Sequence, residues 1–287
     1  MTPQNYYKTR KQRQIRTVDT EFIIAFVHQV RSDHPRMGGR KLLILLDEAL
    51  NQSGIQIGRD RFFDILRAQD LLVPRKRRSA RTTNSYHTLP IFSNLLKDTP
   101  LSGPNQAYVS DITYIRVRES FIYLSLITDA WSRKIVGWHA GDTLEAIGCL
   151  NALEMALKGL GVAHKPIHHS DRGCQYCCHA YVNRLKEAGF RISMTEENHC
   201  YENGLAERVN GILKDEYNLV SRFLSKRQAI KAISQAIHLY NTKRPHLSLG
   251  YRIPEAVHSV VANRPSLRSV RQPYGLTDSA PRRAVSQ

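Results

Sequence analysis

The chain has 287 residues, of which 42 are Lys or Arg and 25 are Asp or Glu, and its formal net charge is +17 at pH 7. Such an excess of cations predicts a polyanionic partner, because Lys and Arg displace the counterions that nucleic-acid phosphates hold. The longest apolar runs, LLILL and FIYLSLI, are too short to span a bilayer, and the first twenty residues lack the apolar segment of a signal peptide. Composition therefore favours a DNA- or RNA-binding protein over a membrane protein.

Charge is segregated along the chain. Residues 1–100 and residues 221–287 have net charges of +9 and +10, whereas residues 101–220 contain 14 acidic and 12 basic side chains. A merely soluble basic protein would intersperse the two signs, so this distribution favours a carboxylate site between two basic flanks.

Five cysteines are scattered over the chain at irregular spacing. Because an odd, irregular set is not typical of a disulfide framework, reduced thiols and a cytoplasmic location are expected. Cys174 and Cys177 form one CxxC pair beside several histidines, which leaves a structural zinc site as an alternative. The sequence contains no second pair with zinc-finger spacing, so oxygen ligands for a harder metal are favoured.

The N-terminal quarter of the chain predicts a short arm and three helices. Residues 1–18 are polar and basic and are expected to form an unstructured arm. Apolar residues at helical spacing then predict one helix from about Phe22 to the HPRMGG sequence, a second over about 40–50 and a third over about 59–72.

Arginines near the start of the third helix indicate DNA binding by this unit. With Arg59 and Arg61 on its outer face, residues 19–74 resemble a small helix-turn-helix domain that reads DNA, although a plain three-helix bundle with solvated arginines is the alternative. Residues 75–104 are expected to form a basic linker that follows a phosphate backbone. Its candidate DNA contacts are Arg75, Lys76, Arg77 and Arg78.

The middle of the chain has the pattern of a sheet protein. Runs rich in β-branched and aromatic residues predict strands over 107–117, 121–130 and 133–140. Two shorter strands are expected over 165–171 and 191–195, in alternation with helices.

Three helices are predicted among and after these strands, over 143–160, 178–190 and 203–217. The first is expected to bury Leu144, Ile147, Leu150, Met155 and Leu157. Together the elements predict an α/β fold over residues 105–220, with a mixed five-stranded sheet and helices on both faces. A helical extension over 221–262 and a basic, flexible tail over 263–287 are expected to follow.

Three acidic residues occupy unusual places in this pattern. Asp111 lies within the first strand, Asp171 at the end of the fourth, and Glu207 in the helix after the fifth. Between Asp171 and Glu207 there are 35 residues. An acid within an apolar strand is costly unless something compensates its charge. Carboxylates from separate elements that converge on Mg²⁺ ions would provide that compensation. Each acid taken alone could be an ordinary surface charge or helix cap.

The motifs SDITYI, HSDRGCQY, YENGLAERVNGILKDEY and YNTKRPHLSLGYRIPEAV resemble the second-reading-frame transposases of the IS-three family of bacterial insertion sequences. The resemblance runs from about residue 20 to about residue 260. It implies a ribonuclease-H-like catalytic core of the retroviral-integrase type, with a DDE triad matching Asp111, Asp171 and Glu207. The chain departs from the family pattern at Tyr108 and Glu202, where Trp and Asp are frequent.

The resemblance further implies a set of cofactors and partners. Two Mg²⁺ ions, replaceable by Mn²⁺, would support cleavage of element ends and their transfer to target DNA. The chain would assemble at least as a dimer on DNA, and it would act with, or fused to, the protein of an upstream reading frame. It would work in the bacterial cytoplasm, associated with the nucleoid when bound to DNA.

Several residues near the triad are candidate DNA contacts. Lys214 lies seven residues after Glu207 and therefore on nearly the same helix face, where similar enzymes place a Lys or Arg. Weaker candidates flank the acids or belong to the closing motif: Arg208, Asn210, Arg172, Gln175, Arg244 and His246.

Two other functions remain open at this point. A non-catalytic DNA-binding regulator derived from a transposon would share the basic flanks and the candidate helix-turn-helix. A ribonuclease-H-like nuclease would share the carboxylates but would cut DNA without joining it.

Overall fold

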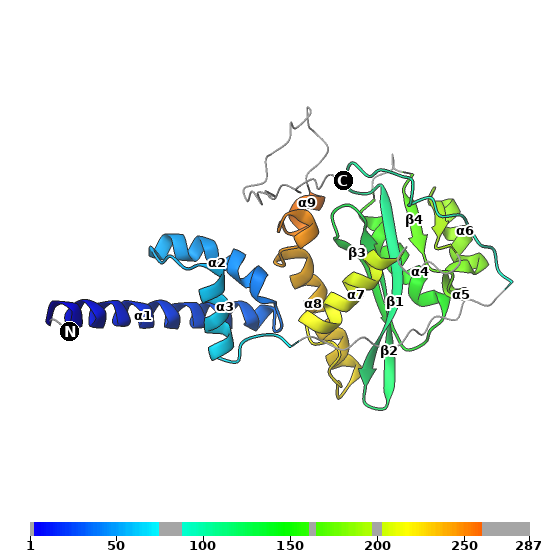
Figure 1. The fold of residues 1–287 in the computed structure, drawn as a ribbon. Coiled ribbons are helices and arrows are strands. Elements are labelled where there is room, and N and C mark those ends of the chain that lie inside the picture. Colours follow the sequence, from blue (N-terminus) through cyan, green and yellow to red (C-terminus); the bar gives the residue numbers. More distant parts are fainter. Residues whose placement is uncertain (1–2, 75–87, 161–164, 197–202, 260–287) are drawn as a thin grey trace, which may run out of the picture.

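The computed structural model describes residues 3–74, 88–160, 165–196 and 203–259. Three N-terminal helices stand beside a larger α/β unit (Figure 1). These helices are α1 (Pro3–Asp33), α2 (Gly39–Ser53) and α3 (Arg59–Ala68), and α3 buries Phe62, Ile65 and Leu66. In the described part of the chain, no helix combines the length and apolar character needed to cross a membrane.

An unstructured arm was predicted over residues 1–18, and this prediction is wrong for residues 3–18. Helix α1 begins at Pro3 and continues without interruption through this segment. The stretch from Gln4 to Val18 contains neither Gly nor Pro, and its Lys, Arg and Gln residues have favourable helix propensities. Basic composition alone therefore was not a sign of disorder.

The larger unit is built on a five-stranded sheet in the order β3-β2-β1-β4-β5. Strand β2 pairs antiparallel with β1 and with β3, whereas β4 pairs in parallel with β1 and with β5. The strands are β1 (Ala107–Val117), β2 (Ser120–Asp129), β3 (Ile135–Gly141), β4 (Ile167–Ser170) and β5 (Arg191–Met194). This mixed sheet confirms the predicted fold class.

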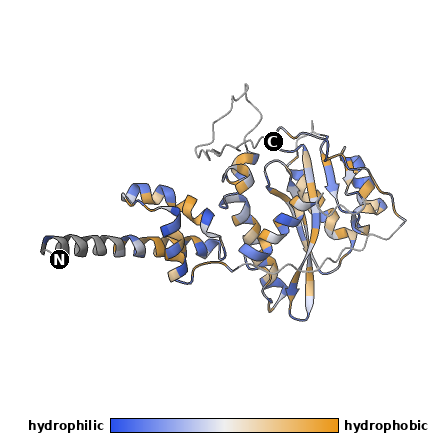
Figure 2. Ribbon diagram, viewed as in Figure 1, coloured by the Kyte–Doolittle hydropathy of each residue, from blue (hydrophilic) through white to orange (hydrophobic). Residues whose placement is uncertain are grey.

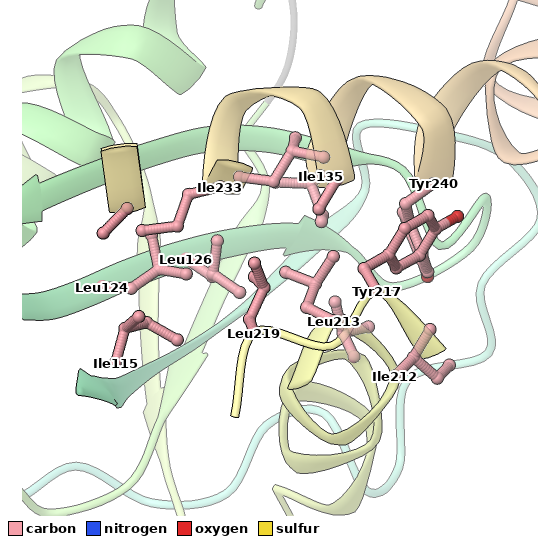
Figure 3. Packing of buried hydrophobic residues seen from close by; sticks show 14 of the residues in the cluster. Ile115, Leu124, Leu126, Ile135, Ile212, Leu213, Tyr217, Leu219, Ile233 and Tyr240 are labelled. Carbon is pink, nitrogen blue, oxygen red and sulfur yellow. The ribbon is translucent and has the colours of Figure 1, made fainter. Parts of the chain in front are cut away.

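Helices cover both faces of the sheet. One face packs against α7 (Gly204–Glu216) and α8 (Lys226–Thr242), and the other against α4 (Ala146–Lys158) and α6 (His179–Glu187). Figure 3 shows Leu124 and Leu126 of β2 facing Ile233 of α8 in the first of these layers. Figure 2 shows apolar and polar residues alternating around the helices, as expected for helices buried on one side.

Three short helices were not predicted: α5 (Cys174–Cys177), η1 (Leu247–Leu249) and α9 (Pro254–His258). Helix α8, which the sequence assigned to an extension, shares one apolar cluster with α7 and the sheet. Its Asn241 also covers the edge of β3, because the side-chain amide donates to the carbonyl of Ile135 and accepts from its N–H, both at 2.9 Å. The extension and the sheet therefore form one packed unit.

The buried face of α4 differs from the prediction. Leu144, Ile147 and Met155 are exposed, and Leu150 and Leu157 are only partly buried. The helix instead buries small residues together with one leucine: Gly148, Cys149, Ala152, Leu153 and Ala156.

Close contact with β3 explains this choice. A Cβ atom added at Gly137 would lie 2.1 Å from the carbonyl oxygen of Ala152 and 3.0 Å from the Cβ of Ala156. The backbone of α4 therefore approaches the strand so closely that only small side chains fit between them. Ile147 and Met155 are left on the outer side of α4.

Substitution of Gly137 by Ala is expected to lower the free energy of unfolding by about 2 kcal/mol or more, because the new methyl group would overlap backbone atoms. Gly211 in α7 is the matched control, since a Cβ there would meet nothing within 4 Å. Gly211→Ala should stabilise the protein by about 0.5–1 kcal/mol through helix propensity. Denaturant unfolding of both variants tests the close contact, and equal stabilities would contradict it.

An ionic cluster joins the N-terminal helices to the larger unit. Glu216, at the end of α7, accepts hydrogen bonds from Arg244 at 2.7 and 2.9 Å and an ion-pair contact from Lys41 of α2. The backbone N–H of Arg36 donates to the carbonyl of Glu216. Burial alone would raise the pKa of Glu216, but Arg244 and Lys41 lower it to about 2.

Substitution of Glu216 by Gln should therefore destabilise the protein by about 3–5 kcal/mol, because it leaves the buried Arg244 and its neighbour Lys41 without a counter-charge. The Glu216 contribution is present above its ordinary pKa of 4.5 and is lost as the pH falls through about 2, so the variant should lose less stability on acidification. Glu255→Gln at the partly exposed pair with Lys134 is the control and should cost about 1 kcal/mol or less. Chemical unfolding between pH 3 and pH 7 measures the free energy of unfolding of both variants and its dependence on pH. Similar losses of stability in Glu216→Gln and Glu255→Gln would argue against the ionic cluster.

Candidate active site

The parallel pairing of β1 and β4 brings two of the three predicted acids together. Val109 lies opposite His169 in this register, and continuing it by two residues places Asp111 opposite Asp171, which directly follows β4. Because side chains alternate between the faces of a sheet, both acids belong to the face that α7 covers.

Asp111 has an unusual electrostatic environment. Burial and the charge of Asp171 raise the pKa of Asp111 to about 7, and Glu207 adds a smaller effect in the same direction. Hydrogen bonds from the side chain of Asn210 (2.8 Å) and the backbone N–H of Ile112 (2.9 Å) oppose this shift. The carboxyl group is thus held in place by donors while a like charge nearby disfavours its ionisation.

Asp171 sits where the chain leaves the sheet. Burial raises its pKa, while the backbone N–H of Gly173 donates to Oδ1 at 3.0 Å and lowers it. A Cβ atom at Gly173 would lie only 3.0 Å from this oxygen and 3.2 Å from Oε1 of Gln175. The absence of a side chain at Gly173 therefore leaves room beside the carboxylate.

Glu207 is exposed in the first turn of α7. Two buried asparagines fix this part of the helix on β1: Asn203 donates to the carbonyl of Ser110 at 3.1 Å, and Asn210 donates to Asp111. The side-chain oxygens of both asparagines are buried and have no hydrogen-bond partner among the described residues. Sequence reasoning missed this anchoring role, although an Asn three residues after Glu207 on the buried side of an amphipathic helix was an available signal.

The three acids do not form a closed metal site in the structure. Within residues 3–74, 88–160, 165–196 and 203–259, no group of three or more His, Cys, Asp or Glu side chains is arranged to hold a metal ion. Asp111 and Asp171 provide paired carboxylate oxygens of the kind that hard divalent cations prefer, and Glu207 lies nearby on α7. These oxygen ligands therefore suit magnesium, and Glu207 would have to move toward Asp111 and Asp171 to complete the site.

The structure corrects three of the predicted DNA contacts. Arg244 is 1% exposed and pairs with Glu216, and His246 is 9% exposed beside Ser248. Asn210 is also buried, with its amide directed at Asp111. These polar residues were predicted to contact DNA because the sequence does not distinguish a buried hydrogen-bond donor from an exposed one.

The other predicted DNA contacts have varied surroundings. Arg59 and Arg208 are exposed, whereas Arg61 and Lys214 are partly buried. Arg172 and Gln175, which follow Asp171 in the chain, donate hydrogen bonds to backbone carbonyls. The acceptor of Arg172 Nε is the carbonyl of Thr195, and the acceptor of Gln175 Nε2 is the carbonyl of Leu144. The linker contacts Arg75, Lys76, Arg77 and Arg78 lie outside the described residues.

The raised pKa of Asp111 predicts a pH-dependent stability. The folded protein retains a proton that the unfolded chain releases, so without divalent metal its stability should fall as the pH rises from 3.8 to about 7. Asp111→Asn removes this titration and should stabilise the protein at pH 8 by about 1 kcal/mol or more. Each unit of pKa shift corresponds to about 1.4 kcal/mol, and the loss of one hydrogen bond offsets part of this gain.

Thermal unfolding at pH 4 and pH 8 in a chelating buffer measures this effect. Asp142→Asn is the matched control, because its side chain is largely exposed in a surface pair with Lys226. If Asp111→Asn and Asp142→Asn gave the same pH profile, the electrostatic strain at Asp111 would be disproved.

Comparison with known proteins adds an independent line of observation. Two family models described as integrase core domain match residues 102–200 and 188–254. The insertion element IS600 uncharacterized 31 kDa protein of Shigella sonnei is 37% identical over 213 residues, which cover 74% of this chain and 78% of that protein. Transposase InsF for insertion sequence IS3A of Escherichia coli (strain K12) is 35% identical over 192 residues, which cover 66% and 67%.

Solved structures also resemble the chain. The HTLV-2 integrase catalytic core domain in complex with magnesium is 20% identical with a TM-score of 0.44, covering 54% of this chain and 97% of that chain. A chain of the simian T-cell lymphotropic virus intasome in complex with PP2A regulatory subunit B56 gamma is 18% identical with a TM-score of 0.49, covering 86% and 79%.

Proposed function

Because the chain belongs to the transposases of the IS-three (IS3) family, we propose that Asp111, Asp171 and Glu207 carry out its DNA cleavage and strand transfer. The protein is a DNA transposase, and its reaction belongs to polynucleotidyl transfer. The observation that best supports these residues is the pairing of Asp111 with Asp171 on one sheet face, where their mutual repulsion contributes to the raised pKa of Asp111. A divalent cation between them would offset that repulsion.

Asp111, Asp171 and Glu207 would hold two Mg²⁺ ions, which Mn²⁺ could replace. When bound, such ions lower the pKa of an attacking hydroxyl and stabilise the charge on the attacking and leaving oxygens of a phosphoryl transfer. Asp111 must be deprotonated to act as a ligand, so its pKa of about 7 makes metal binding dependent on pH near neutrality.

The remaining side chains position the acids and the DNA. Asn210 orients Asp111 through its 2.8 Å hydrogen bond, and with Asn203 it holds the start of α7 against β1. Lys214, two turns beyond Glu207, would contact a DNA phosphate, and Arg208 would provide a second cation. Hydrolysis of one phosphodiester bond would free a 3′ hydroxyl, which would then displace a 3′ oxygen from a target phosphate without a covalent enzyme intermediate.

The proposal extends to domains and partners. Residues 19–74 would bind DNA as a helix-turn-helix-like unit, with Arg59 and Arg61 among its contacts, and residues 75–104 would follow the backbone. Joining two element ends calls for at least two copies on DNA. The protein of an upstream reading frame, or a fusion with it, would assist end recognition, and the bacterial cytoplasm is the proposed location.

Substitution of Asp171 by Asn should reduce metal-dependent cleavage and joining of element-end DNA by more than about 100-fold, because even residues that only support metal ligands contribute about 10- to 100-fold. The assay uses labelled end DNA, a target plasmid and either Mg²⁺ or Mn²⁺. Asp142→Asn, a surface change of the same chemistry, should retain activity.

Two outcomes would contradict the proposal. Full activity of Asp171→Asn would exclude that residue from catalysis. Nicked products without strand-transfer junctions in the wild-type reaction would instead indicate a nuclease.

A further inference from the structure

Three aromatic residues lie together on the β1–β2 hairpin: Tyr114, Phe121 and Tyr123, called here the aromatic platform. Tyr114 and Tyr123 are directly opposite each other in the antiparallel register. The ring of Tyr114 lies 5.4 Å from that of Tyr123 and 6.2 Å from that of Phe121, both in edge-to-face geometry. The rings therefore support one another as a unit.

The platform lies beyond the region of the sheet that α4 covers. Ser125, two residues after Tyr123 and on the same face, contacts Cys149 of α4 at 3.7 Å. Helix α4 starts at Ala146, so the sheet face toward the hairpin turn extends past it. Phe121 is consequently 44% exposed, while the two tyrosines are partly buried. Grouped, exposed aromatic rings on a soluble protein are typical of a binding surface.

Arginines lie on and beside the hairpin that carries the aromatic platform. Arg116 pairs directly with Phe121 across the hairpin and so lies on the same face. At the turn, Arg118 donates to the carbonyl of Leu224, and Arg222 donates to the carbonyl of Arg118. Glu119 pairs with Arg116 and Arg222, so two guanidinium groups share one carboxylate, and Arg118 adds a third cation at the turn. The surplus of positive charge favours an anionic ligand.

The aromatic platform and the proposed catalytic acids lie on opposite faces of the sheet. Tyr114 follows Asp111 by three residues on β1, and side chains alternate between the two faces along a strand. Asp111 accepts a hydrogen bond from Asn210 of α7, whereas the platform shares its face with Ser125, which contacts α4. A ligand on the platform would therefore occupy a surface separate from the acids.

We propose that the aromatic platform stacks unpaired bases of a DNA strand, while Arg116, Arg118 and Arg222 contact its phosphates. This inference rests on the proposed function. Every base has a flat face that can stack on an aromatic ring, so such binding tolerates many sequences. Bases within a duplex already stack on one another, so the platform would select DNA with unpaired bases. The arginine surplus favours DNA over a protein partner.

The test compares the full-length protein with Phe121→Leu, which removes the ring but keeps an apolar side chain at an exposed position. Binding of a single-stranded oligonucleotide and of a duplex is measured by fluorescence anisotropy at several salt concentrations, without divalent metal. Phe121→Leu should weaken single-strand binding about 5- to 100-fold and change duplex binding less than about twofold. The dependence of affinity on salt should stay the same, because no phosphate contact is lost.

Three further variants test the roles of the ring and of the charge and provide a control. Phe121→Trp should restore single-strand binding, because it restores a ring. Arg116→Gln should reduce the salt dependence by about one counterion. Trp131→Leu is the matched control, since Trp131 is 39% exposed beyond the opposite end of β2, and it should leave binding unchanged.

Unchanged single-strand binding by Phe121→Leu would overturn the inference, as would a loss that Phe121→Trp does not restore. A change in self-association with DNA binding intact would also overturn it and would assign the surface to a second copy of the chain. Because the binding assay needs no metal, it is independent of the cleavage test. If wild-type protein joins DNA while Phe121→Leu still binds single strands normally, the platform inference fails and the transposase mechanism stands.

Discussion

The pairing register between β1 and β4 is the constraint on which the active site depends. It places Asp111 and Asp171 on one face of the sheet, although 59 residues lie between them in the sequence. A slip by one residue would move one acid to the opposite face, because side chains alternate along a strand. Asn203 and Asn210 then hold α7 on β1, so the position of Glu207 also derives from this strand pair. The geometry of the site is therefore a property of the sheet.

Helix α7 connects this site to the N-terminal helices. Glu207 lies in its first turn and Glu216 at its last residue, and a helix of 13 residues is about 20 Å long. Glu216 binds Lys41 and Arg244, and the hydroxyl of Tyr217 lies 3.0 Å from Nδ1 of His34, which directly follows α1. The proposed DNA-binding helices and the proposed catalytic acids are thus fixed to opposite ends of one rigid element.

Sequence patterns predicted the five strands and most of the helices, because the periods of apolar residues differ clearly between strand and helix. They were less informative where tertiary contacts decide. The sequence could not reveal that Gly137 allows α4 to pack closely against β3. Because of this close packing, Ile147 and Met155 are exposed, whereas burial was expected. It also could not show that the polar groups of Asn210 and Arg244 point inward, since only the folded chain provides their partners.

The amide of Asn241 has a consequence for solubility. An uncovered edge strand offers its backbone groups to other strands, which leads to aggregation. Asn241 satisfies both groups of Ile135 at the start of β3, so this part of the edge is closed to intruding strands. Where many copies of one chain crowd onto the same DNA, such a capped edge limits open-ended fibril growth.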